Sequence, residues 1–84
     1  MMGQVDNNMR AAWALEACKA FIDAKGDRYS AYSAEEVIGD LIGDLLHMAR
    51  ANGLDPATLV SGPPRRFEVE EFEDGGPATV GVWP

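Results

Sequence analysis

The sequence predicts a mainly α protein: two antiparallel amphipathic helices plus a short third helix, with a C-terminal β-hairpin or extended tail. Apolar residues recur at helical spacing over residues 33–54. An alanine-rich segment precedes them, and the last twenty residues change to alternating apolar and acidic side chains. We therefore expect one small domain over residues 1–84, with a helical core over 7–62 and an extended or hairpin tail over 63–84.

The first helix is predicted over residues 7–25. Asp6 is one of three consecutive residues that can cap its start, and Gly26 follows its last helix-forming residue, Lys25. Residues 1–5 carry no pattern and are expected to fray. The short connection over 26–32 favours antiparallel packing of the first two helices.

The second helix carries the clearest local signals in the chain. Ser33 and Glu36 have the spacing of a capping box, and Gly53 stands where a helix C-terminus favours a left-handed residue. One of the two tyrosines in the preceding connection is expected to pack on Val37 as a hydrophobic staple. The capping residues, the apolar face and the terminal glycine therefore all indicate the same helix.

The third helix is predicted to be short. Asp55 followed by Pro56 is a typical helix start, because a proline at the first helical position loses no hydrogen bond. Gly62, Pro63 and Pro64 are expected to end the helix, since an internal proline removes a backbone donor and clashes with the preceding turn.

The tail is predicted to form a small hairpin of residues 66–72 with 78–83. Phe67 and Val69 alternate with glutamates, and residues 73–77 contain the turn signal Glu-Asp-Gly-Gly-Pro. An isolated two-stranded hairpin is marginal in water, so the tail is expected to lie on the helices or against a partner. The predicted core consists of Trp13, Ala17, Phe21, Ile38, Leu41, Ile42, Leu45, Leu46 and Leu59.

Composition disfavours some classes of function. The net charge of −7 disfavours direct binding to nucleic acid or to an anionic membrane, because phosphate binding depends on Lys and Arg, and it favours a basic protein partner. The sequence shows neither a secretory signal nor a long apolar span, and Cys18 is its only cysteine. We expect a soluble protein of the host cytoplasm that carries no cofactor and no metal.

Residues 37–60 resemble part of a group of small acidic helical proteins encoded by phages, prophages and plasmids. The resemblance is carried by a later Phe67-Glu68 pair and by Asp44, Leu45, Leu46, His47, Gly53, Leu54 and Asp55. In those proteins the helix after Gly-Leu-Asp tends to continue toward the Phe-Glu pair, whereas here Gly62-Pro63-Pro64 is expected to interrupt it. The resemblance implies a mobile-element protein that binds and blocks host machinery, and anti-CRISPR inhibitors are one such class.

The predicted function is a non-enzymatic, acidic interaction protein that blocks a basic surface of a host defence protein. Acids spaced along an extended tail would also permit mimicry of a nucleic-acid backbone; guarding an edge strand against aggregation is the alternative. The candidate partner-binding residues are Asp40, Asp44, Phe67, Glu68, Glu70, Glu71, Phe72, Glu73, Asp74 and Trp83.

A second hypothesis is a homodimeric structural or assembly module. Gly39 and Gly43 form a small-xxx-small pair, and mid-helix glycines suggest the close approach of another helix, from the same chain or a second copy. A metal site at Asp40, Asp44 and His47 is disfavoured because further ligands are lacking. Cys18 is interpreted as a buried structural residue, so no catalytic residue is predicted.

Overall fold

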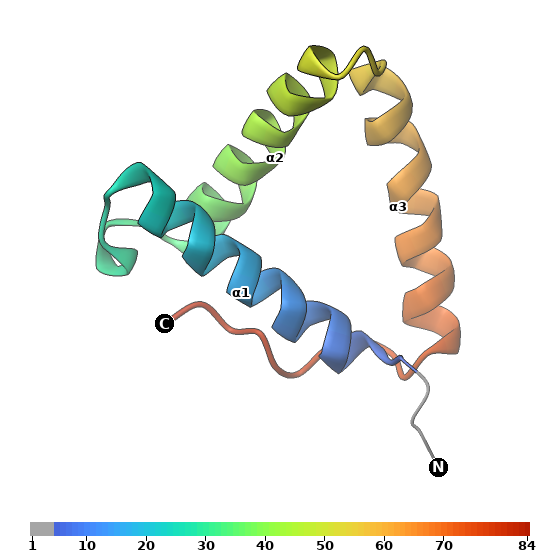
Figure 1. Ribbon diagram of the computed structural model, residues 1–84. Helices are drawn as coiled ribbons and strands as arrows, with labels where there is room; N and C mark the ends of the chain where they lie inside the picture. The colour runs from blue at the N-terminus through green and yellow to red at the C-terminus, as the bar shows by residue number, and fades with distance from the viewer. Residues whose placement is uncertain (1–4) are drawn as a thin grey trace.

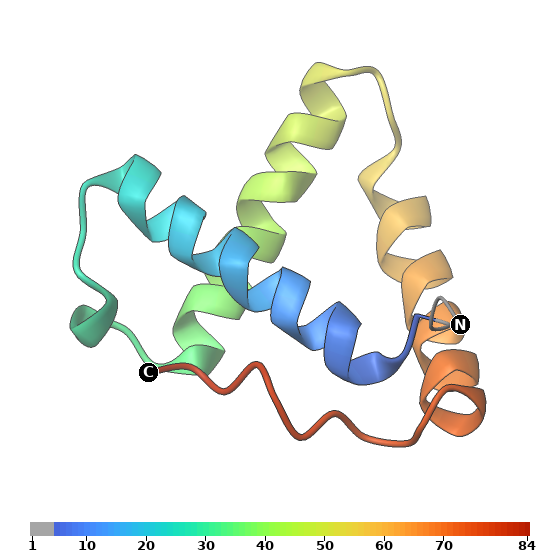
Figure 2. The same cartoon turned by 60° about the horizontal axis from the view of Figure 1, so that its bottom comes forward.

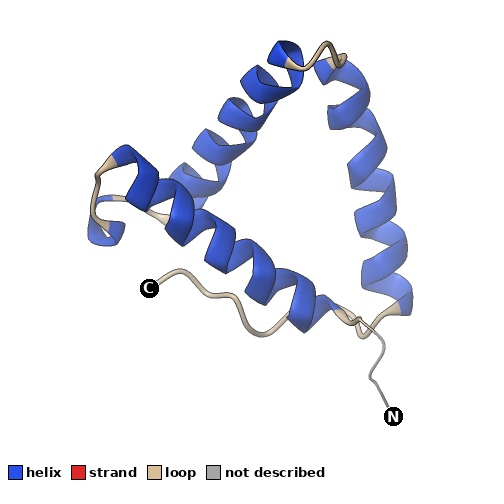
Figure 3. Ribbon diagram, viewed as in Figure 1, coloured by secondary structure: helices blue, strands red, loops and turns tan. Residues whose placement is uncertain are grey.

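A computed structural model describes residues 5–84 and arranges three helices as the sides of an open triangle (Figure 1). The helices are α1 (Asn7–Lys25), α2 (Ala34–Ala51) and α3 (Pro56–Glu73), and a single 3-10 turn, η1 (Tyr29–Ala31), connects the first two. The described residues contain no strand (Figure 3). The mainly α class is thus confirmed and the C-terminal hairpin is wrong. The expected fraying falls mostly on residues 1–4, which lie outside the described residues.

The ends of α1 and α2 follow from local sequence, as predicted. The Asp6 carboxylate accepts a hydrogen bond from the Met9 N–H at 2.9 Å, and Gly26 ends α1 with φ +77°. At α2, the Ser33 hydroxyl accepts from the Glu36 N–H at 3.2 Å, and the Glu36 carboxylate accepts from the Ser33 N–H at 3.0 Å. Both halves of the capping box are therefore formed.

The third helix is much longer than predicted. Asp55 caps it and Pro56 opens it, as expected, but the helix continues through Pro63 and Pro64 to Glu73. Gly62 removes one obstacle, because the residue before a proline avoids helix through clashes of the proline ring with its N–H and its Cβ, and glycine has no Cβ. The following Arg- and Glu-rich residues favour helix, so the predicted strand over 66–72 is the second half of α3.

The C-terminal segment runs back along α1 as an extended strap (Figure 2). The predicted turn at residues 73–77 is present, with positive φ at Gly75 and Gly76, but it connects a helix to this strap rather than two strands. Its far end is fixed at the η1 connection, where the Trp83 indole N–H donates to the Tyr32 carbonyl at 3.1 Å. Residues 78–83 lie over helix α1, and this contact replaces the pairing that a hairpin would have supplied.

Helices α1 and α2 cross near their adjoining ends and then diverge, instead of packing antiparallel along their lengths (Figures 1 and 2). The buried cluster sits at this crossing and consists of Cys18 and Ile22 from α1 with Val37 from α2. The two tyrosines of the connection pack against the same cluster, in agreement with the predicted staple on Val37. The core is therefore a corner of the triangle and not its centre.

Most of the predicted core is not buried. Phe21, Leu41 and Leu46 are half-buried, whereas the other six predicted core residues are exposed: Trp13, Ala17, Ile38, Ile42, Leu45 and Leu59. The physical reason is the divergence of the helices, which leaves the inner sides of α2 and α3 without a facing layer. The radius of gyration is 14.3 Å, against about 12 Å for a compact chain of this length.

Within residues 5–84, no helix is both long enough and apolar enough to cross a membrane.

Candidate interaction surfaces

The inner sides of the three helices enclose an open apolar space, which we call the inner hollow. Next to α1 the hollow has a volume of about 660 Å³, and between α2 and α3 it continues with a volume of about 550 Å³. On the α1 side the hollow is lined by small side chains, among them Ala11, Ala14 and Ala17. The side formed by α2 and α3 is bulky, with a lining that includes Ile38, Ile42, Leu45, Leu59, Val60 and Phe67.

The arm of the hollow between α2 and α3 is lined by apolar residues alone. Leu45 on the α2 side is 46% exposed, and Phe67 on the α3 side is 57% exposed. Helical spacing places Leu59, Pro63 and Phe67 on one side of α3, toward α2. The apolar faces were therefore predicted in position, but they meet an open space where the prediction expected a packed core.

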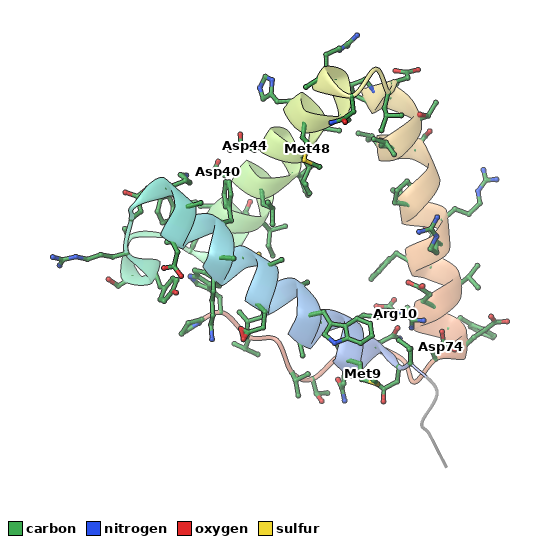
Figure 4. All side chains as sticks on the ribbon, viewed as in Figure 1. Met9, Arg10, Asp40, Asp44, Met48 and Asp74 are labelled. Atoms are coloured by element: carbon green, nitrogen blue, oxygen red, sulfur yellow. The ribbon has the colours of Figure 1, made fainter. Side chains whose placement is uncertain are left out.

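The acids predicted on helix α2 lie on its outer side. Figure 4 shows Asp40 and Asp44 pointing away from the triangle, while Met48 points into it. Asp40 forms an ion pair with Lys25 of α1 at 3.6 Å, so one of the two predicted contact acids is engaged within the chain. His47 is exposed on the same helix. Among the described residues, no group of three His, Cys, Asp or Glu side chains is placed to hold a metal ion.

Two acids at the end of α3 close the triangle. The Arg10 guanidinium of α1 contacts the Glu70 carboxylate at 3.3 Å and the Asp74 carboxylate at 3.0 Å. Figure 4 labels Arg10 and Asp74 at this corner. The Asn7 side chain adds hydrogen bonds to the Glu70 carbonyl at 2.9 Å and to the Gly76 carbonyl at 2.7 Å. These predicted partner-binding carboxylates thus have a structural role within the chain.

Sequence reasoning missed Arg10 and Asn7. One usable signal was present: Arg10 follows Asn7 by three residues, on one face of a helix in a strongly acidic chain. The partner acids, however, lie sixty and more residues away, and the prediction had placed them on a strand. Only the observed path of α3 brings these groups together.

A second exposed surface lies on the opposite side of α3, and we call it the outer patch: Glu68, Val69, Phe72 and Glu73. Phe72 is 90% exposed and Val69 is 51% exposed. Phe72 follows Glu68 by four residues and Val69 by three, so these side chains are neighbours on the helix surface. Within residues 5–84, neither Glu68 nor Glu73 takes part in an ion pair or a side-chain hydrogen bond.

The remaining predicted contact residues separate from this patch. Phe67 and Glu71 line the inner hollow, and Trp83 is half-buried, with its ring edge-on to Tyr29 at a centroid distance of 5.8 Å. The acids from 68 to 74 lie around a helix, so the regular spacing along an extended ribbon, on which nucleic-acid mimicry depended, is absent. The structure therefore divides the ten predicted residues among five places: the outer side of α2, the inner hollow, the closing ion pairs, the outer patch and, for Trp83, the end of the strap.

The two glycines of α2 do not mark a close contact within the chain. A Cβ atom added at Gly39 or Gly43 would meet no atom within 4 Å. An approach of α1 to this face, one of the two alternatives left open by the sequence, is therefore contradicted. In contrast, a Cβ on Gly81 of the strap would lie 2.8 Å from the Ala11 carbonyl oxygen, so the close approach in this protein is between the strap and α1.

The ionisable groups near the core have structural settings. Cys18 is buried as predicted, and this burial raises the pKa of its thiol, which disfavours the nucleophilic thiolate. The Tyr29 hydroxyl donates to Asp23, and this hydrogen bond is the main cause of the raised pKa of Tyr29. The Tyr32 hydroxyl donates to Asp27 at 2.7 Å, which raises the pKa of Tyr32 in the same way. Both tyrosines thus keep their protons well above neutral pH.

No protein-family model, curated protein or solved structure matches this chain.

Proposed function

We propose that this chain is a non-enzymatic interaction protein that binds a basic surface of another protein through the outer patch of α3. The observation that carries the proposal is Phe72, an aromatic side chain that is 90% exposed and lies one helical turn after Glu68, which makes no ion pair within residues 5–84. Aromatic residues are common anchors of protein interfaces, because they bury a large apolar area with few rotatable bonds. The flanking carboxylates would then face Lys or Arg side chains of the partner.

The overall charge supports a basic partner. A net charge of −7 on an 84-residue chain creates a negative field that speeds encounter with positively charged surfaces. Four of the acids are engaged by Arg10, Lys19 or Lys25, so they contribute less to such a contact than their number suggests. Glu68 and Glu73, which extend into solvent beside Phe72, are the acids best placed to make it.

The resemblance of residues 37–60 to small acidic proteins of mobile elements supports a host protein as the partner. The helix after Gly-Leu-Asp continues to the Phe67-Glu68 pair, as it tends to in the proteins that this chain resembles. A partner that normally binds nucleic acid would offer the required basic surface. Binding to the outer patch requires only a basic surface with an apolar recess for Phe72, so other basic proteins also fit.

The proposal is tested in two steps. The tagged chain first captures proteins from a host lysate at low salt; each captured protein is then purified and titrated with the untagged chain by calorimetry. We expect one complex whose affinity falls as NaCl is raised, because screening weakens contacts between charged surfaces. Phe72→Ala is expected to weaken this complex by about tenfold or more while leaving its salt dependence unchanged.

A matched pair of charge reversals locates the contact. Glu68→Lys on the outer patch and Asp44→Lys on α2 each change the net charge by the same amount at an exposed helical position. We expect Glu68→Lys to weaken the purified complex about tenfold more than Asp44→Lys does. Equal effects of the two reversals would mean that only overall charge matters, and the outer patch would be rejected as the binding site.

A further inference from the structure

The protein leaves more surface in water than a folded chain of this size should. The accessible surface is 6442 Å², whereas about 4,900 Å² is typical for a folded protein of 9.1 kDa. The difference exceeds the roughly 800 Å² that each partner buries in a standard protein interface. Bulky residues that line the hollow, such as Ile42, Leu45 and Phe67, contribute to this exposed surface.

The buried core is too small to account for the stability of the fold by itself. Only Cys18, Ile22, Val37 and Ala49 are buried apolar residues within the described part of the chain. Small domains without disulfides or metals commonly gain the missing stability by association. Because the shortfall concerns the folded state itself, the missing partner must be present whenever the chain folds, and a second copy of the same chain meets that condition.

Charge and shape both allow a second copy. The arm of the hollow between α2 and α3 is lined by apolar residues alone, and Asp40 and Asp44 point outward (Figure 4). The acids of the hollow, Glu70 and Glu71, lie on its α1 side, where Arg10 pairs with Glu70. A twofold interface must be self-complementary. This hollow offers both halves: an alanine surface on α1 around Ala14, and a bulky ridge on α2 around Leu45.

We propose that the inner hollow is the interface of a homodimer, in which the apolar ridge of α2 from each copy enters the hollow of the other and packs toward the alanine surface of α1. This contact uses the inner side of the triangle and leaves the outer patch of α3 free. It goes beyond the proposed function, and it differs from a dimer through Gly39 and Gly43, which lie on the other side of α2.

The first experiment measures the oligomeric state of the wild-type chain. We expect sedimentation equilibrium to give twice the 9.1 kDa chain mass, and the thermal midpoint to rise with protein concentration. A chain that keeps its helical circular dichroism as a 9.1 kDa monomer at every concentration would overturn the proposal. A helical monomer that native mass spectrometry shows to carry an apolar small molecule would overturn it as well.

Single substitutions then locate the interface. Leu45→Glu in the hollow is expected to weaken the dimer by at least about a hundredfold, because burial of an unpaired carboxylate is strongly unfavourable. Phe72→Glu is the matched control, since it places the same charge at an exposed apolar position outside the hollow and should leave the dimer intact. Gly43→Leu is likewise expected to have no effect, since open space surrounds Gly43.

A milder variant covers the case in which Leu45→Glu fails to fold. Leu45→Ala favours helix formation but removes most of the ridge, so it should weaken the dimer about tenfold or more while the helical signal persists. If Gly43→Leu dissociates the dimer and Leu45→Ala does not, the interface is the glycine face and the inner hollow is rejected. Failure of this proposal leaves the outer patch untouched, since that surface is tested by Phe72→Ala against a different molecule.

Discussion

Replacing Trp83 by alanine is expected to release the strap from the core and to destabilise the protein by about 2–3 kcal/mol. Full truncation of a buried aromatic residue costs about 3–5 kcal/mol, and Trp83 is only half-buried, which lowers that figure. Within the total, the indole hydrogen bond to the Tyr32 carbonyl contributes about 1 kcal/mol, and the edge-on contact with Tyr29 contributes a similar amount.

Thermal and urea unfolding followed by far-ultraviolet circular dichroism measure this change. For a domain of this size, a loss of 2–3 kcal/mol corresponds to a drop in Tm of roughly 10–20 °C. All variants are compared at one protein concentration, so that any self-association affects them equally. Trp83→Phe separates the two contributions, because it keeps an aromatic edge but lacks the N–H donor, and it should cost about 1 kcal/mol.

Val82→Ala is the matched control for the strap. Val82 is 77% exposed and adjacent to Trp83, so its truncation is expected to change stability by less than about 0.5 kcal/mol. If Trp83→Ala were as stable as Val82→Ala, the strap would not be part of the folded core. The reasoning that anchors the strap to the core through Trp83 would then be refuted.

Three further predictions concern backbone and pH. Gly39→Ala and Gly43→Ala should each stabilise the protein by about 1 kcal/mol in thermal unfolding, because alanine favours helix and the added Cβ meets open space; a loss of stability would reveal an unseen contact. Gly81→Ala should destabilise it by about 2 kcal/mol or more, since φ is +84° and the Cβ would collide with the Ala11 carbonyl. The hydrogen bonds from Ser33 lower the pKa of Glu36 below its ordinary value of 4.5. The ionised Glu36 carboxylate therefore stabilises the protein above that pH, and this stabilisation is lost as the pH falls through the lower folded-state pKa. Glu36→Gln should lose stability less steeply in an acid titration, and identical profiles for the two proteins would contradict a role of the Glu36 carboxylate.

Local signals predicted the helix ends, and long-range geometry limited the rest. Asp6 with Gly26, and Ser33 with Glu36, act within one or two turns, so the bounds of α1 and the start of α2 could be derived from neighbouring residues alone. The prediction that Pro63 and Pro64 end the third helix was wrong because it also used local signals alone. The two prolines are strong local breakers, but the Arg- and Glu-rich residues that follow them favour helix, and Gly62 lacks the Cβ that would clash with Pro63.

Burial was predicted less well than periodicity. The apolar stripe through Leu41 and Leu45 was located correctly, but its spacing reports only which residues share a face and not what covers that face. The roles of Glu70 and Asp74 depended on Arg10, which the chain approaches only after α3 has run its full length. Of the candidate contact residues, Glu68 and Glu73 could be placed at the surface from their charge alone, whereas the exposure of Phe72 depends on the path of α3.

The triangle is closed at its third corner almost entirely by polar groups. Arg10 and Asn7 hold the end of α3, and the side chains of Arg10 and Glu70 retain 30% and 26% of their exposure. Partly exposed polar contacts open more readily than packed apolar ones, so α3 should swing away from α1 while the Cys18–Ile22–Val37 corner stays folded. In hydrogen–deuterium exchange, the amides of α3 would lose protection before those around Ile22, and added salt would widen the gap between the two rates.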